Sequence, residues 1–428
     1  MSKMKKIIVV DNYDTRNNGV MAMGMSFVQE ISNCFDKPEF SFFSSFEEVD
    51  KKRYGEQGII VNPMFWKAKL WPGKVFDILY FVGLVLFAVI IKLFSCPKLN
   101  KNIERFRNAD AIVSLCGEDL YSDHCSWQLI LYELFPFVLA KVFNKPYVIF
   151  AQTLGPFNKK RSRFLLRYVI GMSSLVTIRE SVSFDMVKNI LKEEKSQFVF
   201  TGDSAFFLRP IEMKIAKQLV AVDLKRNIYD KKVVGISISH LFTQSIFPTV
   251  SHLEDKYKYF VEAIVSISDF LSKEYKVNIV FVPHVTVSHN DDRRIALDVL
   301  EKIKSKDSVF ALESEYQANQ IKGIIHSCDF FIGCRMHSLV AAVSGNIPTL
   351  ALAYSYKTIG VIGPIVKDNL IVDVREISPE KLKENVLNQF NYLWTHESEV
   401  SDHINKNMKK QYQQSLKNFE LLKNVMNK

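Results

Sequence analysis

The sequence lacks the cysteine patterns that bind metals or cross-link secreted domains. Its six cysteines include no C-x-x-C pair and no histidine partner at the spacing of a zinc site. Several of them lie within apolar runs, where a free thiol behaves as a small hydrophobic side chain. The pattern indicates a reducing compartment and predicts that the protein has no metal site.

Targeting signals and repeats are also missing from the sequence. The N-terminus has only a four-residue apolar run, Ile7 to Val10, before Asp11, which indicates a first strand rather than a signal peptide. No internal repeat or low-complexity tract is visible. We therefore expect a cytoplasmic globular protein.

Length and composition indicate a two-domain globular enzyme. The chain has 428 residues, more than a single hydrophobic core usually organises, with 48% hydrophobic and 24% charged residues. Its formal net charge of +10 favours anionic partners, such as phosphorylated metabolites or acidic lipid headgroups. Lysine and arginine are scattered and no nucleic-acid-binding module occurs, so we expect no nucleic acid partner.

Strand-like and helix-like segments alternate in both halves of the chain, which predicts parallel sheets with right-handed crossovers. The charged segment 209–232 is the expected domain boundary. Residues 379–428 are predicted to form two helices that could return to the first domain. Strands are expected at 6–10, 111–115, 147–152, 175–178 and 198–200, and then at 233–239, 278–284, 309–312, 329–334 and 349–354.

An apolar insertion at 65–98 interrupts this alternation. It contains Val75 to Phe94, with no charged residue from Ile78 to Ile91. The segment is flanked by tryptophans and lysines, as at a headgroup boundary: Trp66, Trp71, Lys67, Lys69, Lys74, Lys92 and Lys98. Two interpretations stay open, a helix docked on a membrane and a buried core helix, while a full membrane span is less favoured.

The most informative segment runs from Asp329 to Lys357. An apolar strand at 330–333 precedes Arg335 and His337, and a helix at 338–344 leads to a second apolar strand at 349–353. Ligands of open α/β sheets bind at the carboxyl ends of strands. Arginine offers a planar fork of donors to carboxylate or phosphate, and histidine exchanges protons near neutral pH. The segment therefore predicts an anion site with a proton donor.

The spacing R-M-H, S-G-N-I-P and Y-S-Y-K in this segment resembles the signature of polysaccharide pyruvyl transferases. Further matches extend the resemblance from Ile7 to about Lys357. The sequence departs from the family at Cys116-Gly117-Glu118, where members often have paired glycines. The matching segments are Ile7–Gly19, Ala111–Asp123, Lys145–Phe157, Thr177–Glu180, Asp203–Phe206, Val282–His284 and the acids Asp291 and Asp292.

The resemblance implies a fold of two facing Rossmann-like, doubly wound α/β domains, GT-B-like, with a cleft between them. Residues 1–210 would form the acceptor-binding domain, 211–375 the donor-binding domain and 376–428 the C-terminal helices. The implied reaction moves a pyruvyl group from phosphoenolpyruvate to two hydroxyls of one sugar. It forms a cyclic ketal and releases phosphate. Because many bacterial surface glycans are built on lipid carriers, the protein could contact the inner face of the cytoplasmic membrane through 65–98.

This reaction makes definite chemical demands on the protein. The donor carries a carboxylate and a phosphate, so its site needs two or three cations. Protonation of the enol carbon needs a general acid, and the sugar hydroxyls need a base. Phosphoenolpyruvate is a co-substrate, and the reaction requires no further cofactor.

Residues at predicted strand ends meet these demands. His337 is the expected acid and Arg335 the anion clamp, and the base is Glu118 or Asp119. Asp203, by contrast, is expected to order its own loop, and Asp291 and Asp292 to serve as a helix cap or first-turn acids. The expected donor-binding residues are Arg335, His337, Lys357, Arg179 and His284, and the acceptor-binding residues are Asn17, Asn18, Gly19, Glu118, Asp119 and Tyr121.

Two other functions fit parts of the sequence. A GT-B glycosyltransferase that uses a nucleotide sugar would share the fold, but its site usually places an acid in the second domain to bind ribose. A non-catalytic, membrane-associated assembly subunit would account for the apolar segment. It would not account for Arg335, His337 and Lys357.

Overall fold

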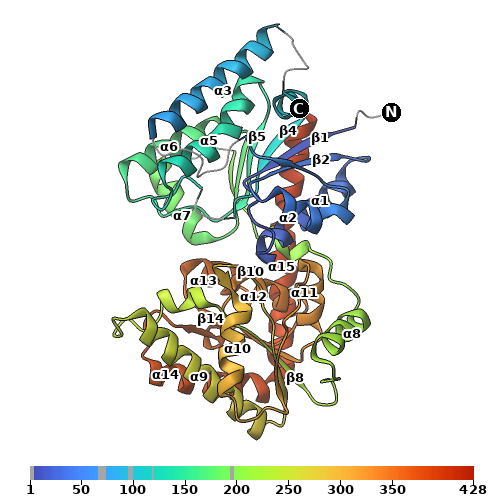
Figure 1. Ribbon diagram of the computed structural model, residues 1–428, viewed down its shortest axis with the longest axis vertical. Helices are drawn as coiled ribbons and strands as arrows, with labels where there is room; N and C mark the ends of the chain where they lie inside the picture. Colours follow the sequence, from blue (N-terminus) through green and yellow to red (C-terminus); the bar gives the residue numbers. More distant parts are fainter. Residues whose placement is uncertain (1–3, 66–73, 95–99, 118–119, 193–196) are drawn as a thin grey trace. The chain divides into compact units, whose positions relative to one another are not determined.

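The computed structural model describes residues 4–65, 74–94, 100–117, 120–192 and 197–428, which form two compact α/β units (Figure 1). Unit 1 comprises the chain up to Thr15, Met23–Ser204 and Gln414–Lys428. Unit 2 comprises Arg16–Ala22 and Ala205–Gln413. The fold class predicted from the sequence, two doubly wound parallel-sheet domains, is confirmed.

Unit 1 is built on a seven-stranded parallel sheet with the strand order β3-β2-β1-β4-β5-β6-β7. Strands β1, β4 and β5 are buried along nearly their whole length, as expected for a parallel sheet covered on both faces. The strands are β1 (Lys6–Val10), β2 (Glu39–Ser44), β3 (Ile60–Pro63), β4 (Ala111–Ser114), β5 (Tyr147–Gln152), β6 (Leu175–Ile178) and β7 (Phe198–Phe200).

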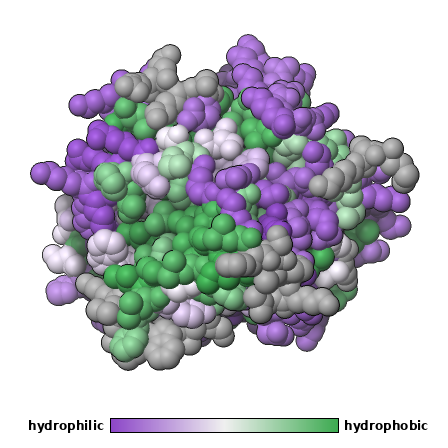
Figure 2. Space-filling view, turned by 90° about the horizontal axis from the view of Figure 1, so that it is seen from above, coloured by the Kyte–Doolittle hydropathy of each residue, from purple (hydrophilic) through white to green (hydrophobic). Residues whose placement is uncertain are grey.

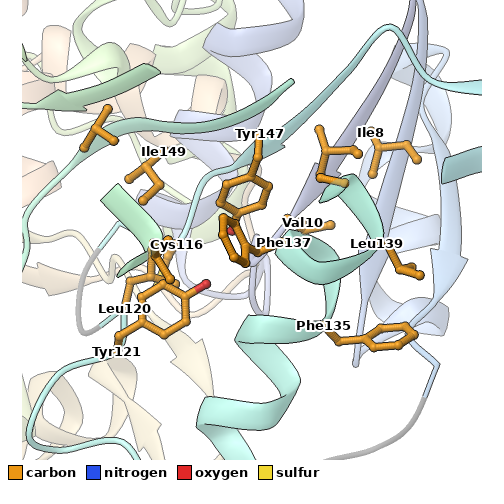
Figure 3. Packing of buried hydrophobic residues seen from close by; sticks show 14 of the residues in the cluster. Ile8, Val10, Cys116, Leu120, Tyr121, Phe135, Phe137, Leu139, Tyr147 and Ile149 are labelled. Atoms are coloured by element: carbon orange, nitrogen blue, oxygen red, sulfur yellow. The ribbon is translucent and has the colours of Figure 1, made fainter. Parts of the chain in front are cut away.

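Helices cover both faces of the unit 1 sheet, with α1 and α2 on one face and the helices that follow β3 to β6 on the other (Figure 1). Their apolar sides meet the sheet in a core where Tyr121, Phe137 and Tyr147 lie among aliphatic side chains (Figure 3). The helices are α1 (Asn18–Cys34), α2 (Glu47–Tyr54), α3 (Lys74–Phe94), α4 (Lys101–Asn108), α5 (Trp127–Val142), α6 (Lys160–Met172) and α7 (Ser181–Leu191).

Unit 2 is built on a six-stranded parallel sheet with the order β12-β9-β8-β13-β14-β15. A short antiparallel hairpin, β10 (Thr286–Val287) with β11 (Asn290–Asp291), lies outside this sheet. The sheet strands are β8 (Val233–Ser237), β9 (Asn278–Phe281), β12 (Val309–Ala311), β13 (Phe330–Gly333), β14 (Thr349–Ala353) and β15 (Ile371–Asp373).

Helices also surround the unit 2 sheet, and they include the two C-terminal helices that the sequence predicted. The long last helix continues from unit 2 into unit 1 at about Gln414. The helices are α8 (Met213–Leu224), α9 (Leu253–Glu274), α10 (Asp292–Lys302), α11 (Ala318–His326), α12 (Met336–Ser344), α13 (Tyr356–Ile362), α14 (Pro379–Thr395) and α15 (Glu397–Asn427).

Both sheets reverse direction at an equivalent point. The strand order reverses between β1 and β4 in unit 1, and between β8 and β13 in unit 2. At such a point, the loops that follow the two neighbouring strands run to opposite faces of the sheet. A crevice forms between these loops at the carboxyl ends of the strands. Asp11 follows β1 and Arg335 follows β13 closely, so each unit carries a charged residue at its own reversal point.

The division of the chain differs from the sequence-based division at 1–210, 211–375 and 376–428. Residues 205–210 and 376–413 belong to unit 2, whereas the last fifteen residues belong to unit 1. The segment Arg16–Ala22, which contains Asn17, Asn18 and Gly19, also lies with unit 2, although the sequence-based division placed it in the first domain.

The apolar segment forms helix α3, which lies outside α5 in Figure 1. Its window Phe76–Leu93 has a mean hydropathy of 2.4, long and apolar enough to cross a membrane by length and composition alone. Only 11% of that window is buried. The buried-core interpretation of this segment is therefore wrong for the structure described.

Candidate functional site

Arg335 lies directly after β13, where it precedes helix α12. Its Nε and Nη2 bind the two carboxylate oxygens of Asp292, at 3.2 and 2.7 Å, and Nη2 also donates to Asn290 Oδ1 at 2.9 Å. Among the described residues, Nη1 makes no hydrogen bond. One edge of the guanidinium is therefore held in place, and the remaining donors are left for a ligand.

Asp292 fixes the arginine from the start of α10. Its Oδ2 also accepts hydrogen bonds from the backbone N–H groups of His284 (3.1 Å) and Val285 (2.9 Å). Burial raises the pKa of this carboxyl, and the guanidinium together with the two backbone donors opposes that effect. The sequence placed Asp292 only as a first-turn acid, whereas its side chain reaches Arg335, 43 residues away. Asp291 does cap α10, by accepting from Arg293 N–H.

His284, which follows β9, is buried with neither ring nitrogen hydrogen-bonded within the described part of the chain. Burial lowers the pKa of its imidazole well below 6.5, and the neighbouring His337 and Arg335 lower it further. His284 is therefore neutral at physiological pH. An unpaired buried imidazole costs stability, which makes this position a candidate for function rather than for packing.

His337, in the first turn of α12, meets the Asn-Gly turn at the start of α1. A Cβ on Gly19 would come within 2.2 Å of His337 Nδ1, so only glycine fits here. Asn17 caps α1 by accepting from Gly19 N–H at 3.0 Å, and Asn18 N–H donates to His284 O at 3.1 Å. Asn18 and Gly19 thus lie against the two histidines of unit 2, and the predicted role of this turn in binding the acceptor stays a prediction.

A small pocket in unit 2 is lined by both histidines. Asn18, Lys322 and several alanine and aliphatic side chains complete its wall. Lys322 donates to the backbone oxygen of Phe206 at 3.0 Å. The structure thus brings Arg335, His337 and His284 into one neighbourhood, and their predicted roles in donor binding stay predictions.

One predicted residue of this unit, Lys357, and a further histidine, His240, lie elsewhere on its loops. Lys357 lies in the first turn of α13, after β14, which is the strand next to β13. His240 follows β8 at the start of a short 3-10 helix, where it is exposed with its ring 5.4 Å from that of Tyr257. Within the described ranges, no group of three or more His, Cys, Asp and Glu side chains is placed to hold a metal ion.

Arg179 does not offer a free cation in unit 1. Its Nη1 forms a buried ion pair with Asp203 at 2.9 Å, and its other donors bind Thr153 Oγ1 (2.9 Å) and Gly117 O (2.8 Å). This arrangement ties the loops after β4, β5 and β7 together. The expectation that Asp203 orders its own loop agrees with this pair, whereas a donor-binding role for Arg179 would require the pair to open.

The predicted acceptor residues of unit 1 divide into two groups. Glu118 and Asp119 lie outside the described residues, so their role as base stays a prediction. Tyr121 is fully buried and packs in the core (Figure 3), while its O–H donates to Glu133 O at 3.1 Å. The side chain of Tyr121 is therefore part of the core, and its predicted role in binding a sugar stays a prediction.

Two buried acids in unit 1 were missed by the sequence reasoning. Asp11 directly follows β1 with a positive φ of 58°, and burial raises its pKa to about 7, opposed by a weaker interaction with Ser114. Burial raises the pKa of Glu133 to about 8, and the charge of Asp11 adds to this shift. Glu133 accepts from Tyr13 O–H at 2.9 Å and from Tyr121 N–H at 3.0 Å.

A signal for these acids was present in the sequence. Asp11 directly follows an apolar strand, and Glu133 is the one charged residue in the apolar run from Trp127 to Ala140. A lone acid in an apolar helix is either paired or functional, because burying a charge alone is costly. Both acids titrate near neutral pH, which is the range useful for proton transfer.

Solved structures with a similar fold cover nearly the whole chain. A UDP-GlcNAc 2-epimerase from Neisseria meningitidis has a TM-score of 0.56 at 11% identity and covers 96% of this chain and 100% of its own. A glycosyltransferase from Rickettsia africae has a TM-score of 0.54 at 15% identity and covers 99% and 96%. HepE from Anabaena, solved with UDP and glucose, has a TM-score of 0.55 at 10% identity and covers 99% of both chains. At these identities the likeness shows the fold alone, which is GT-B-like.

Sequence comparison is more specific. The amylovoran biosynthesis protein AmsJ from Erwinia amylovora is 22% identical over 286 residues, which is 65% of this chain and 65% of that protein. The chain therefore spans just under two thirds of the length of this curated relative. The model of the polysaccharide pyruvyl transferase family matches residues 21–356. This match covers most of the chain and includes Arg335 and His337, so the chain belongs to the polysaccharide pyruvyl transferase family.

Proposed function

We propose that this chain transfers a pyruvyl group from phosphoenolpyruvate to two hydroxyls of one sugar in a surface polysaccharide or its lipid-linked precursor. The product is a cyclic ketal, and phosphate is released. The observation that carries this proposal is the neighbourhood of Arg335, His337 and His284 at strand ends of unit 2. Family membership and the name of the relative AmsJ support a polysaccharide as the acceptor.

The donor's negative charges would be bound by Arg335 and Lys357. Because Asp292 already occupies one edge of the guanidinium, Arg335 binds the donor through its remaining N–H groups in a fixed orientation. The ion pair with Asp292 also offsets the arginine's charge, so a second cation is needed for a substrate with a carboxylate and a phosphate. Lys357 follows the neighbouring strand, and the positive end of helix α12 adds to the attraction.

His337 would act as the general acid. Burial lowers the pKa of His284 well below 6.5, so this imidazole is neutral and is a poor general acid, which leaves His337 as the proposed acid of the pair. Gly19 leaves just enough space for the ring, and Asn18 holds the backbone of His284. Asn18 and Gly19 are thus positioning residues for the acid.

The proposed reaction balances without a cofactor. His337 protonates the CH₂ carbon of phosphoenolpyruvate, and the resulting cationic carbon forms a C–O bond with the first sugar hydroxyl. The C–O bond to phosphate then breaks, and the second hydroxyl closes the ketal. The two hydroxyl protons replace the proton given by His337 and protonate the departing phosphate. Glu118 or Asp119 is the proposed base for these hydroxyls.

The test measures phosphate release from phosphoenolpyruvate by the purified protein, with a panel of sugars and lipid-linked glycans as acceptors. We expect release that needs both an acceptor and Arg335, so that Arg335→Ala is inactive while its far-ultraviolet circular dichroism is unchanged. Absence of phosphoenolpyruvate binding, with tight binding of a nucleotide sugar instead, would replace the proposal by a glycosyltransferase. Binding of neither ligand would favour the non-catalytic assembly subunit.

We also propose that the protein works in the cytoplasm, at the inner face of the cytoplasmic membrane. Phosphoenolpyruvate is a cytoplasmic metabolite, and the described free cysteines agree with a reducing compartment. Fractionation of cells that express the chain tests this location: recovery in an extracellular or periplasmic fraction would contradict it.

A further inference from the structure

Helix α3 presents an apolar face to solvent on the outside of unit 1. Leu79 is 61% exposed, Leu86 58% and Leu93 70%, and these residues recur every seven positions along one side of the helix. Figure 2 shows the broad hydrophobic area that results, bordered by hydrophilic residues. A contiguous exposed apolar surface of this kind marks a contact with a partner or a membrane.

The opposite side of α3 is fixed to the unit. Ala88 and Ile91 are fully buried, and Phe81 packs edge-on against Phe135 of α5, with 5.8 Å between the ring centroids. With 21 residues the helix is about 31 Å long, enough to cross a bilayer core. Spanning would require it to leave α5 and expose Phe135, so the helix is better suited to lie on a membrane than to cross it.

Helix α6, on the same face of the sheet as α3 and α5, adds a second apolar stripe. Phe164 is 69% exposed, Tyr168 50% and Met172 42%, at a spacing of four residues. Tyr168 packs on Phe137 of α5, so α3 and α6 both contact the same helix. Exposed aromatic side chains with a polar edge are enriched at the headgroup level of membranes.

Basic side chains accompany both stripes. The segment from Lys159 to Met172 carries Lys159, Lys160, Arg161, Arg163 and Arg167 and no acidic residue, and Lys92 is exposed near the end of α3. Exposed cations beside an apolar surface attract anionic lipid headgroups. The cores of protein–protein interfaces, by contrast, are depleted of lysine.

We propose that the exposed faces of α3 and α6 form a docking surface for a bilayer that contains anionic lipid, with α3 lying in the plane of the membrane. We call this surface, Phe76–Leu93 together with Phe164, Tyr168 and Met172, the docking face. The proposal rests on exposure, spacing and charge within unit 1, and it holds whether or not the chain transfers pyruvate.

The test is flotation of the purified full chain with vesicles of phosphatidylcholine, with or without phosphatidylglycerol. We expect flotation that is stronger with the anionic lipid and weaker in high salt. Leu79→Glu combined with Leu86→Glu should lower the partition coefficient roughly 100-fold, since each leucine loses its transfer from water and a charge is added. Val222→Glu is the matched control, because Val222 is 75% exposed on α8 of unit 2, outside the docking face.

The charge contribution is tested separately. Lys92→Glu with Lys160→Glu should weaken binding to anionic vesicles by about 10-fold or more, and Lys381→Glu with Lys383→Glu on α14 should leave it unchanged. Circular dichroism and calorimetric binding of phosphoenolpyruvate show that each variant is folded, so failure here is distinct from failure of the proposed function.

Three results would overturn the proposal. Wild-type flotation by the Leu79→Glu, Leu86→Glu variant would show that α3 is not the contact. A wild-type dimer that ignores vesicles and that this variant converts to monomer would assign the face to a second copy of the chain. Resistance of the membrane-bound protein to alkaline extraction would indicate a spanning helix instead.

Discussion

The strand order of both units reverses at an equivalent point, but the charged residues beside that point differ. In unit 2 the loop after β13 carries Arg335 and leads to His337, whereas in unit 1 Asp11 follows β1 and lies close enough to Glu133 to raise its pKa. The topology decides where a loop can hold a ligand, and the side chains decide which charge it accepts. This difference supports the proposal that unit 2 binds the anionic donor.

The buried acids show how this difference arises. Asp292 in unit 2 has a guanidinium and two backbone donors around it. In unit 1, burial raises the pKa of Asp11 and of Glu133, and the charge of Asp11 raises that of Glu133 further, because like charges in a buried site disfavour ionisation. Asp292 thus serves as a fixed counter-ion for Arg335, whereas Asp11 and Glu133 can take up protons near neutral pH.

The largest expected effect is on the proposed acid. His337→Gln should lower kcat for phosphate release by about 10²–10⁴-fold, because a positioned acid typically contributes that much. The affinity for phosphoenolpyruvate should change much less, since Arg335 and Lys357 remain. Steady-state kinetics and calorimetry on the same variant separate the two quantities. Turnover near the wild-type rate would remove His337 as the acid.

Two glycines on α1, Gly19 in unit 2 and Gly24 in unit 1, allow the same substitution to be compared in both units. A Cβ on Gly19 would meet His337 Nδ1 at 2.2 Å, and one on Gly24 would meet Tyr54 Oη at 2.2 Å in unit 1. Gly19→Ala should displace the imidazole and lower kcat roughly 10-fold or more, because small misplacements of a catalytic group are costly.

Gly24→Ala is the matched control for this variant. It introduces an equally close contact on the same helix, against a tyrosine of unit 1, so it should lower the melting temperature without a specific loss of turnover. Equal kinetic losses in the two variants, with equal changes in melting temperature, would show that Gly19 acts only through the stability of α1.

The acid pair of unit 1 predicts a pH dependence of stability. The pKa values of Asp11 and Glu133 rise from 3.8 and 4.5 to about 7 and about 8 on folding. As the pH rises, the unfolded chain therefore releases these protons at a lower pH than the folded chain does. The stability that the pair contributes is fully present below pH 4 and is lost as the pH rises toward 8. Asp11→Asn and Glu133→Gln should lose less free energy of unfolding between pH 4 and 8 than the wild type.

Urea unfolding at several pH values measures this difference. Asparagine tolerates the positive φ of Asp11, so the substitution tests the charge rather than the backbone. Identical pH profiles for the wild type and both variants would mean that the two carboxyls ionise as they do in the unfolded chain.

A smaller effect of the opposite sign is expected for His284 in unit 2. Its pKa is lowered on folding, so the stability that it contributes is present above about pH 6.5 and is lost as the pH falls below that value. His284→Asn should flatten the loss of stability in mild acid, as measured by thermal unfolding between pH 7 and 5. The same loss of stability in the variant as in the wild type would show that folding does not lower the pKa of His284.

Much of the fold follows from local patterns in the sequence. The five strands predicted for unit 2 match β8, β9, β12, β13 and β14 within two or three residues, because each is a continuous apolar run in a buried parallel sheet. Strands β2 and β3 were missed. The former alternates phenylalanine with serine, and the latter is four residues long and ends at Pro63.

The site was predictable only in part, because its partners come from distant segments. Arg335 and His337 could be recognised in the sequence because they follow a predicted strand, and His284 because it ends another predicted strand. That Asp292 would bind Arg335 depends on the β10–β11 hairpin, and that Gly19 would meet His337 depends on Arg16–Ala22 joining unit 2. Such long-range pairings leave no periodic signal in one sequence.

The most direct test of the central claim, that unit 2 binds the donor through Arg335, is calorimetric titration with phosphoenolpyruvate. The wild type, Arg335→Lys and Asp11→Asn are compared at one pH and salt concentration. Arg335→Lys keeps the charge but loses the fork, so its affinity should fall roughly 10-fold to 100-fold, while Asp11→Asn should bind like the wild type. Binding by Arg335→Lys at wild-type affinity would contradict the account.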